Sequence, residues 1–326
     1  MKKKLEGLVA IVTGSGQGVG KGIAQVLARE GVKVLTNNRS PKIINEAELV
    51  NLSEEEKNNF YKMRGDAESA AQEINELGGE AIAFYGDVSD DETAKAMVET
   101  AIKRWGRIDI LVNNAAGLGS GFIHDTSEEE WEKQTIPKLK GAFNLMKYAV
   151  PYMQEQKFGR IINVASDAWI GLAGLSVYSA ANAGIVGLSK GAAKELYKYG
   201  ITVNTICPQA ASPGHILNFA NAKKNIESLV GANKIDPEKL KAVEAAHATP
   251  DKAAPFVAYL CTTEAGFISG SVFTVTSDSR VSLYSEPFVK ATIKKEENVW
   301  DIDELIQKVP ETLLKDYVSI VQNADW

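Results

Sequence analysis

Short apolar runs alternate along the chain with longer segments whose apolar residues recur every three or four positions. The first pattern is typical of buried strands, and the second of helices that pack one face on a sheet. Strands are predicted at these apolar runs: residues 8–13, 32–36, 81–85, 108–112, 160–165, 201–206 and 267–276. Because strands and helices alternate, we predict an α/β fold with a Rossmann-type doubly wound parallel sheet in a single domain.

Three segments depart from this alternation and divide the chain. Residues 41–65 are polar and charge-rich, and they are predicted to form a surface insertion after the second strand. Residues 213–249 are helical and mixed in character, with glycine and proline breaks. The predicted domain covers residues 1–276, and residues 277–326 form an extension that is expected to cover the core or brace a neighbouring subunit. Short amphipathic helices are expected in the extension at residues 301–306 and 311–321.

A glycine-rich turn follows the first predicted strand and leads into a helix. Glycines permit a tight turn and a close backbone approach, and the N-terminus of the next helix favours a pyrophosphate. The order of strand, glycine-rich turn and helix therefore predicts a dinucleotide site. Its predicted contacts are Thr13, Gly14, Ser15, Gln17, Gly18, Val19 and Gly20.

The end of the second predicted strand bears on the choice of dinucleotide. A carboxylate at this place would accept hydrogen bonds from the adenosine ribose and repel a 2′-phosphate. This chain instead has Asn38 followed by Arg39, and an arginine is suited to binding phosphate. We predict that both residues contact the cofactor and that NADP(H) is favoured, with NAD(H) as the alternative if Arg39 is an ordinary solvated loop residue.

A tyrosine and an asparagine one helical turn apart form the centre of the predicted active site. Tyr178 and Asn182 project from the same helix face, and Ser166 ends the strand run upstream of them. Together with the glycine-rich turn, these residues resemble the short-chain dehydrogenase/reductase family, whose active site has Ser and then Tyr-x-x-x-Lys. The resemblance covers residues 6–275. Within the family, residues 159–212 are most similar to the dehydrogenase domain of peroxisomal multifunctional β-oxidation enzymes and their bacterial relatives.

The resemblance implies a reaction and a set of further contacts. Tyr178 would be the general acid/base for a ketone or secondary alcohol, Ser166 would orient the reacting oxygen, and the nicotinamide would carry the hydride. The implied substrate is a keto/hydroxy compound or an acyl-CoA, such as a 3-hydroxyacyl-CoA, and residues 213–249 would form its lid. Further implied cofactor contacts are Asp87, Val88, Asn114, Ala115, Ala116, Tyr178, Asn182, Pro208, Gln209 and Ser212.

Two positions depart from the family pattern, and their residue types are exchanged. Asn182 stands where the family has the lysine that binds the ribose and lowers the tyrosine pKa. Lys138 stands three residues before Gly141, where the family has an active-site asparagine, and it follows Pro137, which is expected to kink its helix. We predict that the long Lys138 side chain restores the missing charge beside Tyr178. The alternative is a solvated lysine in a degenerate site.

The exchange leaves two functions open. The first is an active NAD(P)(H)-dependent oxidoreductase that uses Lys138 and Asn182 beside Tyr178. The second is a catalytically impaired subunit that binds cofactor and supports an active homologue in a hetero-oligomer. A homodimer or tetramer is expected in either case, because the helices around Gly141 and Tyr178 match those that pair across subunits in the family. Close packing there is permitted by the small residues Ala180, Ala181, Ala183 and Gly184.

Composition narrows the remaining choices. The net charge of −6, without a basic stripe, argues against nucleic-acid binding, and no apolar stretch has the length of a membrane span. The two cysteines, Cys207 and Cys261, lie in apolar surroundings and indicate a reducing, cytoplasmic location. The three histidines are scattered without metal-ligand spacing, so no metal site is predicted.

Overall fold

The computed structural model describes residues 3–42, 49–210, 212–214, 216, 217, 220, 252–276, 279–295, 300–315 and 319. The chain forms two compact units, Met1–Tyr284 and Ser285–Trp326. Most of the lid predicted at 213–249 lies outside the described residues. None of the helices in the described ranges is both long and apolar enough to cross a membrane.

An eight-stranded sheet forms the centre of the first unit. Its strand order is β3-β2-β1-β4-β5-β6-β7-β8, and only the β7–β8 pair is antiparallel. The order reverses at β1, which lies between β2 and β4, as in doubly wound dinucleotide-binding folds. The predicted Rossmann-type fold is therefore confirmed. The strands are β1 Val9–Val12, β2 Lys33–Asn38, β3 Glu80–Tyr85, β4 Ile110–Asn113, β5 Gly159–Val164, β6 Ile201–Pro208, β7 Val272–Val275 and β8 Val281–Leu283.

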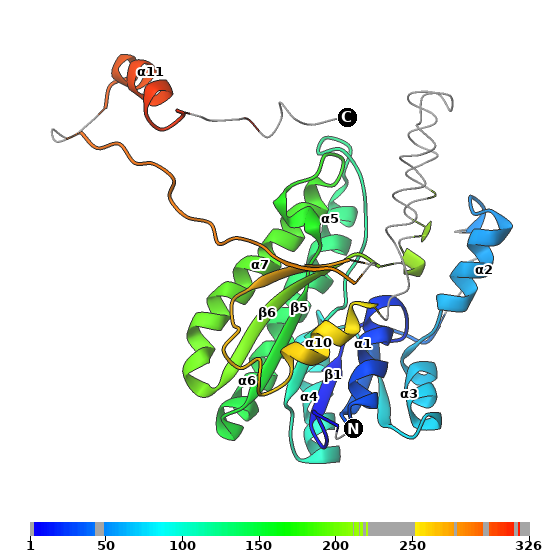
Figure 1. The fold of residues 1–326 in the computed structure, drawn as a ribbon. Coiled ribbons are helices and arrows are strands. Elements are labelled where there is room, and N and C mark those ends of the chain that lie inside the picture. The colour runs from blue at the N-terminus through cyan, green and yellow to red at the C-terminus, as the bar shows by residue number, and fades with distance from the viewer. Residues whose placement is uncertain are drawn as a thin grey trace. The chain divides into compact units, whose positions relative to one another are not determined.

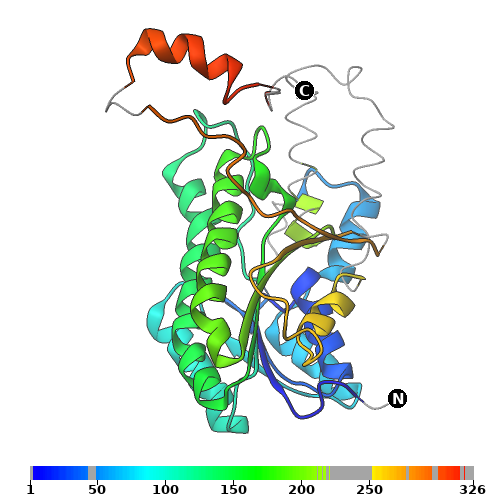
Figure 2. The same cartoon turned by 60° about the vertical axis from the view of Figure 1, so that its left-hand side comes forward.

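Each face of the sheet has its own apolar core. Val9 and Ile11 of β1 pack in the core with α4, α6 and α7, whereas Ala10 and Val12 pack in the core with α1, α3 and α10. Successive strand residues point to opposite faces, so one apolar run supplies both cores. Figures 1 and 2 show the helices on the two faces of the sheet. Among the described residues, the α-helices of this unit are α1 Gly18–Arg29, α2 Glu54–Met63, α3 Ala67–Glu76, α4 Asp91–Trp105, α5 Glu128–Thr135, α6 Gly141–Gln156, α7 Ser176–Leu196 and α10 Ala254–Leu260.

The segment predicted as a polar insertion contains α2, a helix that the sequence analysis did not predict. Ser53 and Glu56 form a capping box: the Ser53 hydroxyl accepts from the Glu56 N–H, and the Glu56 carboxylate accepts from the Ser53 N–H. Phe60 is the buried residue of this helix. After α2, Gly65 lies so close to the Gly16 carbonyl that a side chain would overlap it. The insertion therefore packs directly on the glycine-rich turn.

The last two strands differ from the prediction. β7 begins at Val272 rather than at residue 267, because the chain before it turns at Gly270, whose φ of 81° favours glycine. β8 was not predicted, because its three residues are too few to show an alternating pattern. It runs antiparallel to β7 and covers the edge that β7 would otherwise expose.

The second unit contains one described helix, α11, Ile302–Glu311. Asp301 and Glu304 form its capping box, and the Lys295 and Lys308 ammonium groups lie 5.8 and 5.1 Å from the Trp300 ring centroid. The prediction that one helix ends at residue 306 and another begins at residue 311 was wrong. The single helix α11 spans this interval, because the apolar spacing continues without interruption to Val309. In the helix predicted at 311–321, residues 312–315 form turns instead, and beyond residue 315 only residue 319 is described.

Candidate active site

The glycine-rich turn lies against the residues that follow β4. The Thr13 hydroxyl accepts hydrogen bonds from the backbone N–H groups of Asn114 and Ala115, each at 2.9 Å. The Asn114 side chain donates to the Thr13 carbonyl at 2.9 Å. A side chain at Gly20 would overlap the Asn114 amide. These contacts fix the turn at the carboxyl ends of β1 and β4, the edge where doubly wound sheets bind ligands.

The loop after β6 also reaches the glycine-rich turn. Gly18 has φ of 55°, and a Cβ placed there would lie 2.8 Å from the Cβ of Ser212. At the start of this loop, Gln209 follows Pro208 and donates its backbone N–H to the Val275 carbonyl at 2.8 Å. The predicted contacts Pro208, Gln209 and Ser212 are thus brought to the same edge of the sheet as Gly18.

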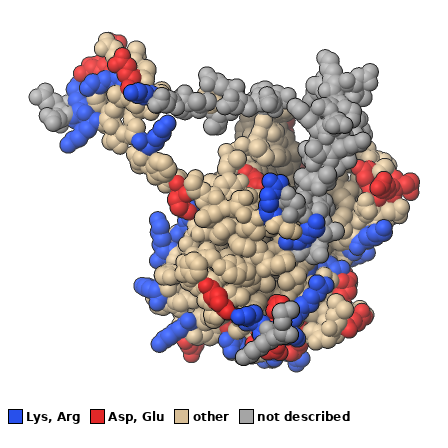
Figure 3. Space-filling view, in the orientation of Figure 1, with Lys and Arg blue, Asp and Glu red and all other residues tan. Residues whose placement is uncertain are grey.

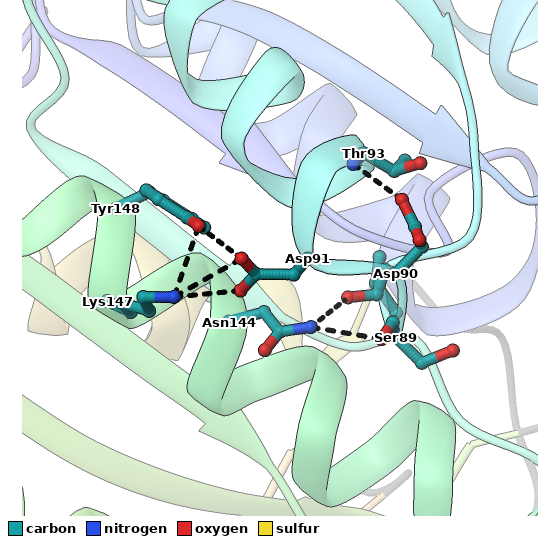
Figure 4. Close-up of polar contacts among 8 residues, drawn as sticks. Ser89, Asp90, Asp91, Thr93, Asn144, Lys147 and Tyr148 are labelled. Atoms are coloured by element: carbon teal, nitrogen blue, oxygen red, sulfur yellow. Dashed lines mark hydrogen bonds and ion pairs between the residues drawn. The ribbon is translucent and has the colours of Figure 1, made fainter.

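The Asp-Val element after β3 is held by α6. Asn144 donates to the carbonyls of Val88 and Ser89 at 3.2 and 3.1 Å, as Figure 4 shows for the Ser89 side of this contact. Gly141 permits the close approach, because a Cβ there would lie 2.5 Å from Val88 Cγ2. The Asp87 carboxylate accepts from the Ser89 N–H at 2.9 Å and from its hydroxyl at 2.6 Å. Asp87 therefore shapes its own turn, and its predicted adenine contact stays a prediction.

A second set of contacts ties α4 to α6 beside this turn. Lys147 and Tyr148 of α6 both hydrogen-bond the Asp91 carboxylate at the start of α4 (Figure 4). The hydrogen bonds and the Lys147 charge lower the pKa of Asp91, with the Tyr148 hydroxyl as the largest cause. The start of α4 and the middle of α6 are therefore held together beside the Val88 turn.

The residues at this edge fit a dinucleotide. Three buried side-chain oxygens, Gln17 Oε1, Asn38 Oδ1 and Asn182 Oδ1, have no hydrogen-bond partner among the described residues. Buried acceptors are normally paired, and ribose hydroxyls and an adenine amino group are donors. Arg39, next to Asn38, is exposed. By contrast, the described residues include no cluster of metal-ligating side chains.

Ser166 and Tyr178 come together at the carboxyl end of β5. Ser166 caps a short 3₁₀ turn, Asp167–Ile170, and its hydroxyl accepts from the Ala168 N–H at 3.3 Å. Tyr178 lies in the first turn of α7. Burial raises the pKa of Tyr178 above its ordinary value, and hydrogen bonds from the side chains of Ser166 and Asn182 oppose that rise.

Lys138 is buried beside Tyr178 and does not point to solvent. It belongs to a π-helical turn, Ile136–Lys140, in which the Gly141 N–H donates to the carbonyl of Ile136, five residues back. The kink predicted at Pro137 is therefore a π-helical turn. The Lys138 side chain is 4 % exposed, and its Nζ donates to the Val164 carbonyl at 3.1 Å.

The Lys138 ammonium lies 5.8 Å from the centroid of the Tyr178 ring. Burial lowers the pKa of Lys138 to about 8. Asn182, which the sequence resemblance aligns with the family lysine, is fully buried and donates its amide to the Tyr178 backbone carbonyl at 2.7 Å. The site thus places one cationic group, a hydroxyl and an amide around the tyrosine, with the cation on a different helix from the tyrosine.

The sequence analysis missed Asp167, whose carboxylate accepts three hydrogen bonds from side chains of other elements. Its position directly after Ser166 was the signal available. It also missed the proximity of Cys207: the charges of Asp167 and Lys138 both act on this buried thiol, and burial raises its pKa.

Comparisons with known proteins identify the family to which this fold belongs. The family model described as short chain dehydrogenase matches residues 51–224. The peroxisomal hydratase-dehydrogenase-epimerase of Saccharomyces cerevisiae is 35% identical over 81% of this chain, which spans only 25% of that protein. The 3-oxoacyl-[acyl-carrier-protein] reductase of Staphylococcus aureus is 34% identical over 61% of this chain and 72% of its own length.

A solved structure shares the fold across nearly the whole chain. A short chain dehydrogenase from Mycobacterium avium superposes with a TM-score of 0.72 at 29% sequence identity, covering 95% of each chain. The chain therefore belongs to the short-chain dehydrogenase family. Relatives in this family are oxidoreductases by name, and the sequence resemblance to the family is confirmed.

Proposed function

We propose that this protein is an NADP(H)-dependent oxidoreductase that interconverts a 3-oxoacyl thioester and the corresponding 3-hydroxyacyl thioester. The names of two relatives support this class of substrate: one is a 3-oxoacyl reductase and the other a hydratase-dehydrogenase-epimerase. Nicotinamide, when bound, supplies or accepts the hydride. A cytoplasmic location stays a prediction, and the yeast relative is peroxisomal by name.

The placement of Lys138 is the observation that carries this proposal. In the direction of ketone reduction, Tyr178 donates its phenolic proton to the substrate oxygen while Ser166 hydrogen-bonds the same oxygen. A tyrosine with a raised pKa is protonated at neutral pH, as this step requires. The phenolate that remains needs a positive charge, and the buried Lys138 ammonium, 5.8 Å from the centroid of the Tyr178 ring, supplies it.

The expected size of this effect is large enough to matter for catalysis. At an effective dielectric of about 20, a unit charge about 5 Å from the phenolate oxygen stabilises it by roughly 3 kcal/mol. That energy corresponds to about two pKa units or about 100-fold in rate.

The proposed preference for NADP(H) is supported by the end of β2. Asn38 and Arg39 replace the carboxylate that would repel a 2′-phosphate, and the exposed Arg39 guanidinium is available for that phosphate. NAD(H) remains the alternative cofactor.

The test is turnover by the purified chain, followed as NADPH oxidation with a series of 3-oxoacyl-CoA esters. The wild-type rate should fall as pH rises through about 8, where Lys138 loses its charge. Lys138→Met should lower kcat by about 100-fold at pH 7 and lose that transition, because it has no charge to lose. Its remaining alkaline limb should shift upward with the tyrosine pKa.

Tyr178→Phe is the matched control, since it removes the proton donor and should abolish turnover in a protein that still binds NADPH. An unaltered rate and pH profile in Lys138→Met would exclude the role assigned to the lysine. A wild-type chain that binds NADPH but turns over no ester would instead favour the second candidate, a cofactor-binding subunit of a hetero-oligomer. The observation behind that candidate is Asn182, which brings no charge to the family lysine position.

A further inference from the structure

The Asp167 carboxylate joins three separate parts of the sheet edge to the turn that carries Ser166. It accepts hydrogen bonds from Gln209 Nε2 at 2.9 Å, from Thr274 Oγ1 at 2.9 Å and from the Tyr284 hydroxyl at 2.7 Å. These donors come from the loop after β6, from β7 and from the residue after β8. One carboxylate therefore sets the relative positions of three segments.

The hydrogen bond from Gln209 fixes the orientation of its amide. A carboxylate accepts hydrogen bonds only, so Gln209 must turn its NH₂ group toward Asp167 and its carbonyl oxygen away. The Gln209 backbone is held as well, because its N–H donates to the Val275 carbonyl at 2.8 Å. Both the backbone and the side chain of this residue are thus fixed by contacts within the protein.

The loop that starts at Gln209 runs along the cofactor edge of the sheet. Three residues further on, Ser212 meets Gly18 of the glycine-rich turn, and on the other side Gln209 adjoins the turn after Ser166. On the basis of the proposed function, we propose that Asp167 is a positioning residue that presents the Gln209 carbonyl oxygen to the carboxamide NH₂ of the nicotinamide. The amide donors of the ligand and the acceptor of Gln209 are complementary.

A role as counter-ion of Lys138 explains the contacts of Asp167 less well. The Lys138 Nζ donates to the Val164 carbonyl and lies over the Tyr178 ring, and no hydrogen bond or ion pair between Lys138 and Asp167 occurs among the described residues. The carboxylate instead directs both oxygens to neutral donors. Its geometry is that of a group that orients neighbours.

The experiment compares two ligands that differ in the nicotinamide. NADPH and 2′-phospho-ADP-ribose, which lacks nicotinamide, are titrated against wild type, Asp167→Ala, Gln209→Ala and the double variant. Each single variant should weaken NADPH binding about tenfold, the effect of one hydrogen bond, and leave the second ligand unaffected. The double variant should lose no more than the single variants, because both act on one contact.

Tyr284→Phe separates positioning from general stability. It removes one hydrogen bond from the same carboxylate but not the one from Gln209, so it should lower the melting temperature and keep the ratio of the two dissociation constants. If Asp167→Ala weakened the binding of both ligands equally, or left the NADPH dissociation constant unchanged, this inference would be overturned while the proposed function would stand. If Asp167→Ala does not fold, the same two outcomes are read from Gln209→Ala. Wild-type protein that binds neither ligand would overturn the proposed function and this inference with it. Binding without turnover would count only against the proposed catalysis.

Discussion

At the scale of single residues, the burial of the charged Lys138 side chain destabilises the folded protein. Lys138 is only 4 % exposed, so its ammonium group loses most of its hydration. Its hydrogen bond to the Val164 carbonyl and its contact with the Tyr178 ring replace only part of that hydration. The lowered pKa expresses that cost. A buried charge that weakens the fold is typical of a functional site.

Lys138→Met should therefore stabilise the folded protein at neutral pH. The folded pKa of about 8 lies below the ordinary 10.5, so the unfolded chain binds more protons between these values and wild-type stability rises with pH there. The full difference is on the order of 3 kcal/mol, and we expect a gain of about 1–3 kcal/mol for the variant at pH 7. Melting temperatures at pH 7 and 9.5 should show this gain shrinking toward the higher pH.

Lys140→Met is the control for that measurement, because Lys140 is an exposed lysine of the same turn. It should melt with wild type at both pH values. A Lys138→Met protein that is less stable than wild type at pH 7 would show that the ammonium contacts outweigh its burial.

Arg39 provides a second prediction at this scale. If its guanidinium binds a 2′-phosphate, Arg39→Ala should weaken NADPH binding by about 1.5–3 kcal/mol, the range for a charge-assisted hydrogen bond. NADH binding should change little, since NADH lacks that phosphate. Fluorescence titration of both cofactors measures the difference, and equal losses for the two would contradict the assignment.

At the scale of elements, regular patterns were predictable and short or interrupted ones were not. The strands predicted at residues 32–36 and 201–206 follow from their apolar runs, and the structure has strands at Lys33–Asn38 and Ile201–Pro208. The helix α2 was missed because its apolar side is reduced to Phe60 within a charged segment. Its capping box, Ser53 with Glu56, was the local signal that could have predicted it.

The candidate site shows the same division between local and distant information. Motif spacing placed Ser166 and Tyr178, and the exchange of residue types directed attention to Lys138. The spacing could not show that Asp167 receives donors from Gln209 and Tyr284, because those contacts join positions 42 and 117 residues apart. Long-range side-chain contacts of this kind depend on the folded sheet and leave no periodic trace in the sequence.

At the scale of the whole molecule, α7 presents a surface suited to a second copy of the chain. Ala183, Gly187 and Gly191 are exposed along the helix, and Phe143 of α6 is 53% exposed. Figure 3 shows a broad area without charged side chains on the face that includes α7, with charges toward its edges. We propose that these two helices pair across the interface of a homodimer or tetramer.

Gly187→Arg should reduce the assembly to a smaller species in light scattering at micromolar concentration. A Cβ at this position meets nothing within 4 Å among the described residues, so the folded subunit tolerates the change, and arginine favours a helix by about 1 kcal/mol over glycine. Gln72→Arg on the exposed side of α3 is the control and should keep the wild-type mass. A Gly187→Arg protein of unchanged mass would place the interface elsewhere, and a monomeric wild type would reject the assembly itself.

The hydrogen bond from Tyr284 to Asp167 decides how far the chain can be shortened. A protein ending at residue 276, the boundary suggested by the motifs, would keep Ser166 and Tyr178 but lose β8 and the phenol beside Asp167. It would also leave the hydrogen-bonding edge of β7 bare, which invites pairing with other chains. The shortest chain that keeps this site intact must therefore include Tyr284, whose hydroxyl donates to Asp167. A truncation intended for crystallisation or engineering should end after this residue.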